Sequence, residues 1–88
     1  MKEQEIQSKI IKYIQAKGGY VVKIVTASKA GVPDILACIE GVFYGFEVKT
    51  ETGRPSPLQL ENIAMIKNAG GKSGIVRSVS DVVKVLDL

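Results

Sequence analysis

The sequence contains no histidine and no tryptophan, and it has a single cysteine, Cys38. Without histidine, the chain can form neither a catalytic triad that uses an imidazole base nor a metal site held by imidazole nitrogens. One cysteine allows no internal disulfide, and a zinc site would need more cysteine or histidine ligands.

Long apolar segments are also absent. No run approaches the ~20 residues of a membrane-spanning helix, and the N-terminus is polar and charged, without the pattern of a signal peptide. We therefore expect no membrane association and a reducing, cytoplasmic location. The 88 residues, 45% of them hydrophobic, are enough for one small folded domain over residues 1–88.

Positive charge is in modest excess, with twelve basic and nine acidic residues. Setting aside four candidate site residues discussed below, Glu5, Asp34, Glu47 and Lys49, leaves eleven bases and six acids. A surplus of this kind suits a polyanionic partner whose backbone is held by Lys and Arg. It is equally an ordinary property of a solvated protein surface.

The pattern of apolar residues predicts helices near both ends and in the middle of the chain, with strands between them. Ile6, Ile10 and Ile14 repeat at helical spacing, and Gly18-Gly19 follows as a helix end. Ser56, Pro57 and Gln59 have the pattern of a helix start. The expected helices are 3–17, 57–69 and 81–86, and the expected strands are 20–26, 35–39, 42–48 and 72–79, with Cys38 inside a buried strand. This order predicts an α/β domain with one mixed sheet flanked by helices.

The two middle strands carry the most informative residues. Glu40-Gly41 between them suits a two-residue hairpin turn, because Gly tolerates positive φ. Paired positions then sum to 81, which places Asp34 opposite Glu47. Facing side chains in an antiparallel pair have Cβ atoms about 5 Å apart, and like charges there are destabilising. A bound hard cation would relieve this repulsion, since Mg²⁺ prefers carboxylate oxygens and keeps several waters.

Lys49 follows Glu47 by two residues, so strand alternation places it on the same face, while Val48 points the other way. Either motif alone has a plain explanation, because Glu-x-Lys is common on exposed strands and Pro-Asp is common at strand starts. Their combination on paired strands indicates a divalent-metal site able to cut a phosphodiester.

Other candidates have strong structural explanations. Glu5 suits the first turn of a helix, where an acid complements the helix dipole, and Glu3 competes with it for any role at the site. Gln59 is explained by the capping box that it forms with Ser56. Three basic residues are open to two interpretations, phosphate contact or simple solvation: Lys23, Lys29 and Arg54.

These residues together resemble a known family. Pro33-Asp34, twelve intervening residues and Glu47-Val48-Lys49 are similar to the core of the PD-(D/E)xK nucleases. More narrowly, the chain resembles the VRR-NUC domain in its small stand-alone phage or bacterial form. The added features are the first-helix glutamate, Gly31 before Pro33-Asp34, and the Ser-x-x-Gln pattern at 56–59. The resemblance extends over nearly the whole chain and implies an α-β-β-β-α-β core.

The resemblance implies that Asp34, Glu47 and the backbone carbonyl of Val48 bind Mg²⁺ or Mn²⁺, with no small-molecule cofactor. Lys49 would position or activate the attacking water, while Glu5, through a water molecule, and Gln59 would lie at the margin of the site. The accessory DNA-binding domains of the large eukaryotic members are absent from this sequence.

The function that we expect is that of a metal-dependent, structure-selective DNA endonuclease. Stand-alone relatives resemble Holliday-junction resolvases, which implies branched DNA as substrate and a homodimer that makes paired cuts. A small chain also gains core by pairing with a second copy. The alternative is a nucleic-acid-binding module with the same fold that is inactive or needs a partner protein.

Overall fold

The computed structural model describes residues 1–87 and contains a four-stranded mixed sheet in the order β1-β2-β3-β4. The strands are β1 (Tyr20–Lys23), β2 (Ile35–Ile39), β3 (Val42–Val48) and β4 (Lys72–Val76). The first three are joined in antiparallel pairs, and β4 runs parallel to β3. The predicted mixed sheet is confirmed.

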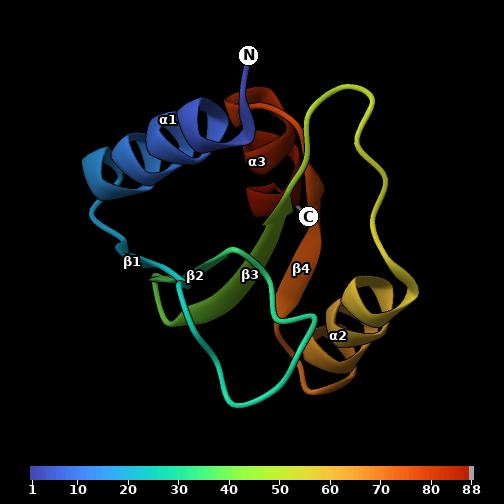
Figure 1. Ribbon diagram of the computed structural model, residues 1–88. Coiled ribbons are helices and arrows are strands. Elements are labelled where there is room, and N and C mark those ends of the chain that lie inside the picture. The colour runs from blue at the N-terminus through green and yellow to red at the C-terminus, as the bar shows by residue number, and fades with distance from the viewer. Residues whose placement is uncertain (88) are drawn as a thin grey trace.

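Three helices pack on this sheet: α1 (Glu3–Ala16), α2 (Pro57–Asn68) and α3 (Val79–Leu86). In Figure 1, α1 and α3 lie together on one side of the sheet, and α2 lies apart from them beside β4. The core lies between the sheet and the first pair of helices. It contains Ile10 and Ile14 of α1, Phe46 of β3 and Val82 of α3, each at 0% exposure. The other face of the sheet is covered by α2 only beside β3 and β4.

The hairpin between β2 and β3 has the predicted register. Ile39 pairs with Val42 and Ile35 with Phe46, so that paired residue numbers sum to 81. Glu40 and Gly41 form the turn with φ values of 51° and 81°, the positive values that a tight two-residue connection requires. One step beyond Ile35 and Phe46, this register brings Asp34 and Glu47 to the same end of the hairpin.

Two predicted strands are shorter in the structure. The predicted strand 20–26 ends at Lys23, since beyond it only the Ile24 N–H still bonds across, donating to the Asp34 carbonyl at 2.7 Å. The predicted strand 72–79 ends at Val76, because the Arg77 N–H donates to Asp81 Oδ2 at 2.8 Å. Ser78 then caps α3, which begins at Val79, before the predicted start at residue 81.

Cys38 is exposed, and the prediction of a buried position was wrong. The neighbouring residues Ala37 and Ile35 face the core, so alternation turns Cys38 and Leu36 to the opposite face. That face lacks a helix over β1 and β2, which leaves Cys38 in contact with solvent. Among the described residues, no helix is long and apolar enough to cross a membrane.

Candidate active site

Asp34 and Glu47 meet where the β2–β3 hairpin opens. Asp34 Oδ2 accepts a hydrogen bond from the Val48 N–H at 2.8 Å, so its carboxylate satisfies a backbone donor at the end of β3. Glu47 is 1% exposed, and its Oε1 has no hydrogen-bond partner among the described residues. A buried carboxylate oxygen without a partner is costly to a folded protein. This cost indicates a site at which a ligand, and not the fold, completes the contacts.

Burial is the largest cause that raises the pKa of Glu47, which reaches about 8. A hydrogen bond with Asp34 and the negative charge of Asp34 raise it further, and Lys49 opposes them. Without a cation, Glu47 thus holds a proton near neutral pH. A divalent cation that binds the pair would displace this proton, because metal ligands must be ionised.

Lys49 lies beside this pair, as strand alternation predicts. Its Nζ is 3.6 Å from Glu47 Oε2, and its side chain is 14% exposed. The Lys49 N–H donates to the Val76 carbonyl at 3.0 Å, which fixes the end of β3 against the end of β4. A partly buried ammonium is thus held on the same face as the two carboxylates, where it can attract a phosphate group.

The loop before β2 is shaped to deliver Asp34. Gly31 has φ of 82°, and a Cβ there would lie 2.8 Å from both the Leu58 carbonyl oxygen and Asn62 Nδ2. Asn62 Nδ2 donates to the Leu58 carbonyl at 2.9 Å and to the Ala30 carbonyl at 3.3 Å. The backbone of this loop therefore packs directly against α2, and this contact fixes the position of Pro33 and Asp34. Asn62 was not among the residues selected from the sequence; a polar residue within the apolar pattern of α2 is the signal that marks it.

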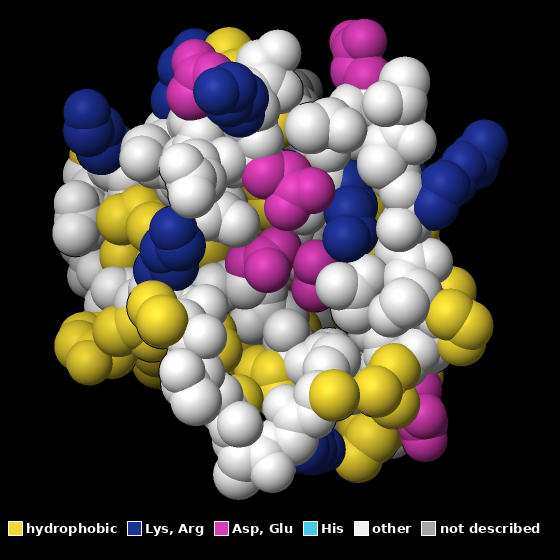
Figure 2. Space-filling model, viewed as in Figure 1, with side chains coloured by type: hydrophobic (Ala, Val, Ile, Leu, Met, Phe, Trp, Pro, Cys, Tyr) yellow, Lys and Arg dark blue, Asp and Glu magenta, His cyan; other side chains and the backbone are white. Residues whose placement is uncertain are grey.

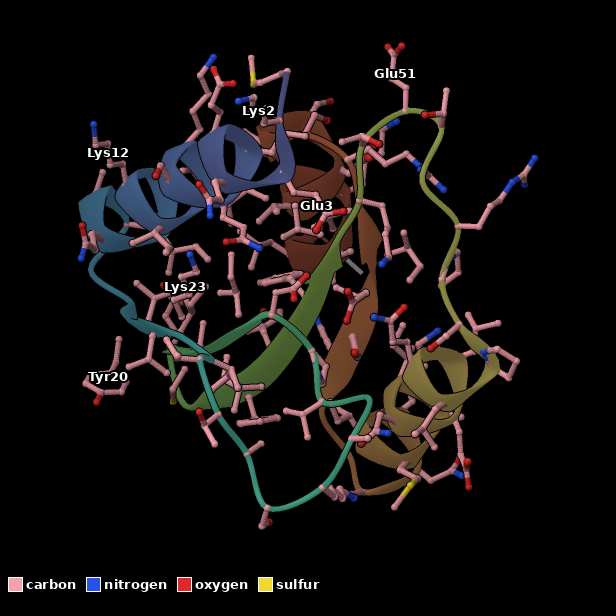
Figure 3. The ribbon with its side chains drawn as sticks, viewed as in Figure 1. Lys2, Glu3, Lys12, Tyr20, Lys23 and Glu51 are labelled. Atoms are coloured by element: carbon pink, nitrogen blue, oxygen red, sulfur yellow. The ribbon has the colours of Figure 1, made fainter. Side chains whose placement is uncertain are left out.

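The structure does not bring Glu5 to the carboxylate pair. The Glu5 side chain is exposed, and its Oε1 accepts a hydrogen bond from the Lys2 N–H at 3.1 Å, as expected for a helix start. Glu3, one of the two acids weighed from the sequence, is partly buried. In Figure 3 the Glu3 side chain points from α1 toward the middle of the molecule. In Figure 2 acidic side chains gather in the middle of this same face, beside basic ones.

Gln59 is held by the predicted capping box. Its Oε1 accepts from the Ser56 N–H at 2.8 Å, and its own N–H donates to Ser56 Oγ at 3.2 Å. The three candidate phosphate contacts, Lys23, Lys29 and Arg54, are all exposed. Lys23 ends β1 and pairs with Ile35, directly after Asp34. Lys29 and Arg54 belong to the loops before β2 and before α2.

Gln7 is a further polar residue near α1's apolar face that the sequence reasoning did not select. It is 7% exposed, and its Oε1 also has no hydrogen-bond partner within residues 1–87. Gln7 follows Glu3 by four residues, so the two lie on the same helix face. An amide within the Ile6, Ile10, Ile14 stripe is the sequence signal that could have found it.

The donor set fits a hard divalent cation. Across residues 1–87, no group of three or more His, Cys, Asp or Glu side chains is close enough to form a complete metal cage. Mg²⁺ does not require one, because it is usually bound by one or two carboxylates and keeps several waters. The partnerless oxygen of Glu47 and the facing Asp34 are donors of the right kind.

The fold and the site define a nuclease domain of the PD-(D/E)xK type, with Pro33-Asp34 directly before β2 and Glu47-Val48-Lys49 at the end of β3. The chain belongs to the archaeal Holliday junction resolvase (Hjc) family, whose model matches residues 2–86. The sequence-based resemblance to the VRR-NUC domain is confirmed by a solved structure described as a VRR_NUC domain. It is 30% identical, with a TM-score of 0.81 and coverage of 97% of this chain and 94% of that one.

Two further solved structures share the fold. One, a VRR_NUC domain protein, is 18% identical with a TM-score of 0.79, over 99% of this chain and 86% of that chain. The other is Hjc of Archaeoglobus fulgidus, a Holliday junction resolvase from an archaeal hyperthermophile. It is 15% identical with a TM-score of 0.66, over 85% of this chain and 67% of that chain. None of the curated proteins compared matches this chain.

Proposed function

We propose that the protein is a metal-dependent, structure-selective endonuclease that cuts branched DNA, in the manner of a Holliday-junction resolvase. The observation that carries the proposal is the buried Glu47 carboxylate with a partnerless oxygen, facing Asp34 and 3.6 Å from the Lys49 ammonium. Membership of the resolvase family supports DNA as the substrate. The surplus of basic residues outside the site is consistent with a polyanionic partner.

In the reaction, a water oxygen adds to phosphorus and the bond to the 3′ oxygen breaks, giving a 5′-phosphate and a 3′-hydroxyl that takes up a proton. Asp34, Glu47 and the Val48 carbonyl would hold Mg²⁺ or Mn²⁺. The bound cation supplies Lewis-acid polarisation of the phosphate and lowers the pKa of a water ligand. Lys49 Nζ places a positive charge where the pentacovalent phosphate accumulates negative charge, and it orients the attacking water.

Glu3 is the better of the two first-helix acids for a place at the site margin. It is partly buried and points inward, whereas Glu5 is occupied at the helix start. We assign to Glu3 the role of holding a water molecule near the carboxylate pair. Gln59 could reach the site only through its amide nitrogen, because its Oε1 is bound to the Ser56 N–H. Lys23, Lys29 and Arg54 are exposed and free to turn toward the DNA backbone.

The test is cleavage of labelled four-way junction, flap, nicked and linear duplex DNA with Mg²⁺ or Mn²⁺. We expect cleavage of the branched substrates that needs the metal and falls at least about a hundredfold in Lys49→Ala, the usual size of the loss of one charge-stabilising group. Binding without cleavage by the wild-type protein with either metal would reject the enzyme. It would favour a nucleic-acid-binding module that is inactive or needs a partner protein.

We also propose that the protein acts as a homodimer. The outer sheet face, defined by Tyr20, Val22, Leu36, Cys38 and Phe43, presents an apolar surface with no helix over β1 and β2. Tyr20 pairs with Cys38 and Cys38 with Phe43, which forms a cross-strand row in which Tyr20 is 72% and Phe43 45% exposed. Beside it lies a groove of about 410 Å³ lined by Leu36, Phe43, Met65 and Ile66. Exposed apolar patches of this kind are typical of protein interfaces.

Light scattering at micromolar concentration tests the dimer. We expect twice the 9.5 kDa mass of one chain for the wild type and a monomer for Phe43→Glu, because a charge would be buried at the interface. A wild-type species of only 9.5 kDa would reject the dimer. We further propose a cytoplasmic location, where the exposed thiol of Cys38 stays reduced.

A further inference from the structure

Arg77 binds the turn that follows Lys49. The turn comprises residues 50–53, and the Arg77 Nη1 group donates to three of its carbonyl oxygens. The acceptors are Gly53 at 2.8 Å, Glu51 at 3.4 Å and Thr50. One guanidinium nitrogen thus binds three carbonyls of a four-residue segment that belongs to no helix or strand. Nothing in the sequence patterns had marked Arg77 for a role at the site.

The backbone of Arg77 is itself fixed. Its N–H donates to Asp81 Oδ2 at 2.8 Å, and the Asp81 N–H donates to Ser78 Oγ at 3.2 Å, which closes the start of α3. Arg77 directly follows Val76, whose carbonyl accepts the Lys49 N–H at 3.0 Å. The guanidinium therefore projects from a rigid junction between β4 and α3.

The turn in its folded position lies against the Lys49 side chain. A Cβ placed on Gly53 would be 3.4 Å from Lys49 Cδ, which shows that the Gly53 backbone borders the methylene stem of the lysine. The Gly53 N–H also donates to the Thr50 carbonyl and to Thr50 Oγ1, each at 3.2 Å. The Gly53 backbone thus packs beside the Lys49 stem, and Arg77 fixes it by donating a hydrogen bond to the Gly53 carbonyl.

We propose that Arg77 is a positioning residue for Lys49: by holding turn 50–53 against the lysine stem, it directs the Lys49 ammonium toward Glu47. A lysine stem has four rotatable bonds, and a free one would spread the ammonium over many positions. Removing the guanidinium leaves three carbonyls of turn 50–53 without their donor, so the turn is no longer held against the lysine stem. The proposal rests on the proposed nuclease function, because Lys49 acts in that reaction.

The experiment is a double-mutant cycle between Arg77→Met, which keeps the apolar stem, and Lys49→Ala. Single-turnover cleavage of a four-way junction is measured at saturating protein, and junction binding is measured with Ca²⁺ in place of Mg²⁺. In the wild-type background we expect Arg77→Met to slow cleavage about 10- to 100-fold, the effect of misplacing a catalytic group by about 1 Å. Junction affinity should change less than about threefold, which corresponds to about 0.6 kcal/mol.

In the Lys49→Ala background, Arg77→Met should reduce the residual rate by less than about threefold, because a residue that acts through Lys49 has no effect once Lys49 is absent. Arg77→Lys keeps a positive donor and should restore most of the rate. Lys12→Ala, which removes a charge that Figure 3 shows pointing away from the site, is the control for lost charge alone. If Arg77→Met does not fold, the same cycle is run with Arg77→Gln, whose shorter side chain also lacks the guanidinium.

Each outcome is decisive. An equal loss of rate with and without Lys49 would overturn the proposal and make Arg77 a structural residue or an independent catalytic one. A loss confined to junction affinity would make it a phosphate contact and overturn the proposal as well. If the wild-type protein cleaves no substrate, the proposed function itself fails, and that result is distinguished in the same assay by the wild-type lane.

Discussion

Replacing Glu47 by Gln should stabilise the metal-free protein, and the gain should depend on pH. The pKa of Glu47 is raised from 4.5 to about 8 in the folded protein, first by burial and then by Asp34. Between these two values the folded state binds more protons than the unfolded state, so the free energy of unfolding falls as the pH rises. The contribution of Glu47 to the stability of the wild-type protein is thus fully present below pH 4.5 and is lost as the pH rises through 8.

The magnitude follows from the size of the shift. One pKa unit corresponds to about 1.4 kcal/mol, so the raised pKa of Glu47 lowers the free energy of unfolding by about 3 kcal/mol at pH 7 and by up to about 5 kcal/mol above pH 8. Gln has nearly the same shape and no ionisation to oppose. The difference in unfolding free energy between Glu47→Gln and the wild type should therefore grow by about 1.4 kcal/mol for each pH unit between 5 and 8.

Urea denaturation of both proteins with a chelator present, at several pH values between 5 and 9, measures this difference. Glu61→Gln, at an exposed position of α2, is the matched control and should change the unfolding free energy by about 0.5 kcal/mol or less at every pH. Adding Mg²⁺ should stabilise the wild type and leave Glu47→Gln unchanged, since only the former binds the cation. A difference between the two proteins that stays constant with pH would refute the burial argument.

Two further predictions concern the delivery of Asp34. Asp34→Ala and Asp34→Asn should both lose metal binding in a calorimetric titration. Only Asp34→Ala leaves the Val48 N–H without its acceptor. It should therefore lower the unfolding free energy by about 1–3 kcal/mol more than Asp34→Asn does. Equal stability of the two variants would show that this hydrogen bond contributes nothing. Backbone strain at a positive φ costs about 1–3 kcal/mol. Gly31→Ala should destabilise the protein by more than this, because its Cβ would also contact the Leu58 carbonyl at 2.8 Å. Gly41→Ala has a similar φ and open space around it, so its melting temperature isolates the strain and should fall less.

Local sequence patterns were enough to predict the hairpin at the centre of the site. The Glu40-Gly41 turn fixes the register. Because side chains alternate between the two faces of a strand, the register then determines which of them share a face. The capping box of Ser56 and Gln59 was predictable for the same reason, because its partners are three residues apart. The structure confirms both.

Contacts between distant segments were not predictable in this way. Glu3 and Glu5 occupy the same first turn, and only the packing of α1 on the sheet decides that Glu3 points inward. The exposure of Cys38 depends on the missing helix over β1 and β2, which no local pattern shows. The end of β4 depends on the hydrogen bond from the Arg77 N–H to Asp81.

The sequence by itself thus determined the pair of facing carboxylates and the lysine beside them, since these follow from one hairpin and its spacing. Its motifs along nearly the whole chain carried the resemblance to the family. The tertiary structure decided how the pair behaves. It buries Glu47 without a partner for Oε1, binds Asp34 to the Val48 N–H and places Arg77 across the turn after Lys49. These properties arise from burial and from contacts between segments far apart in the chain, and such contacts exist only once the chain has folded.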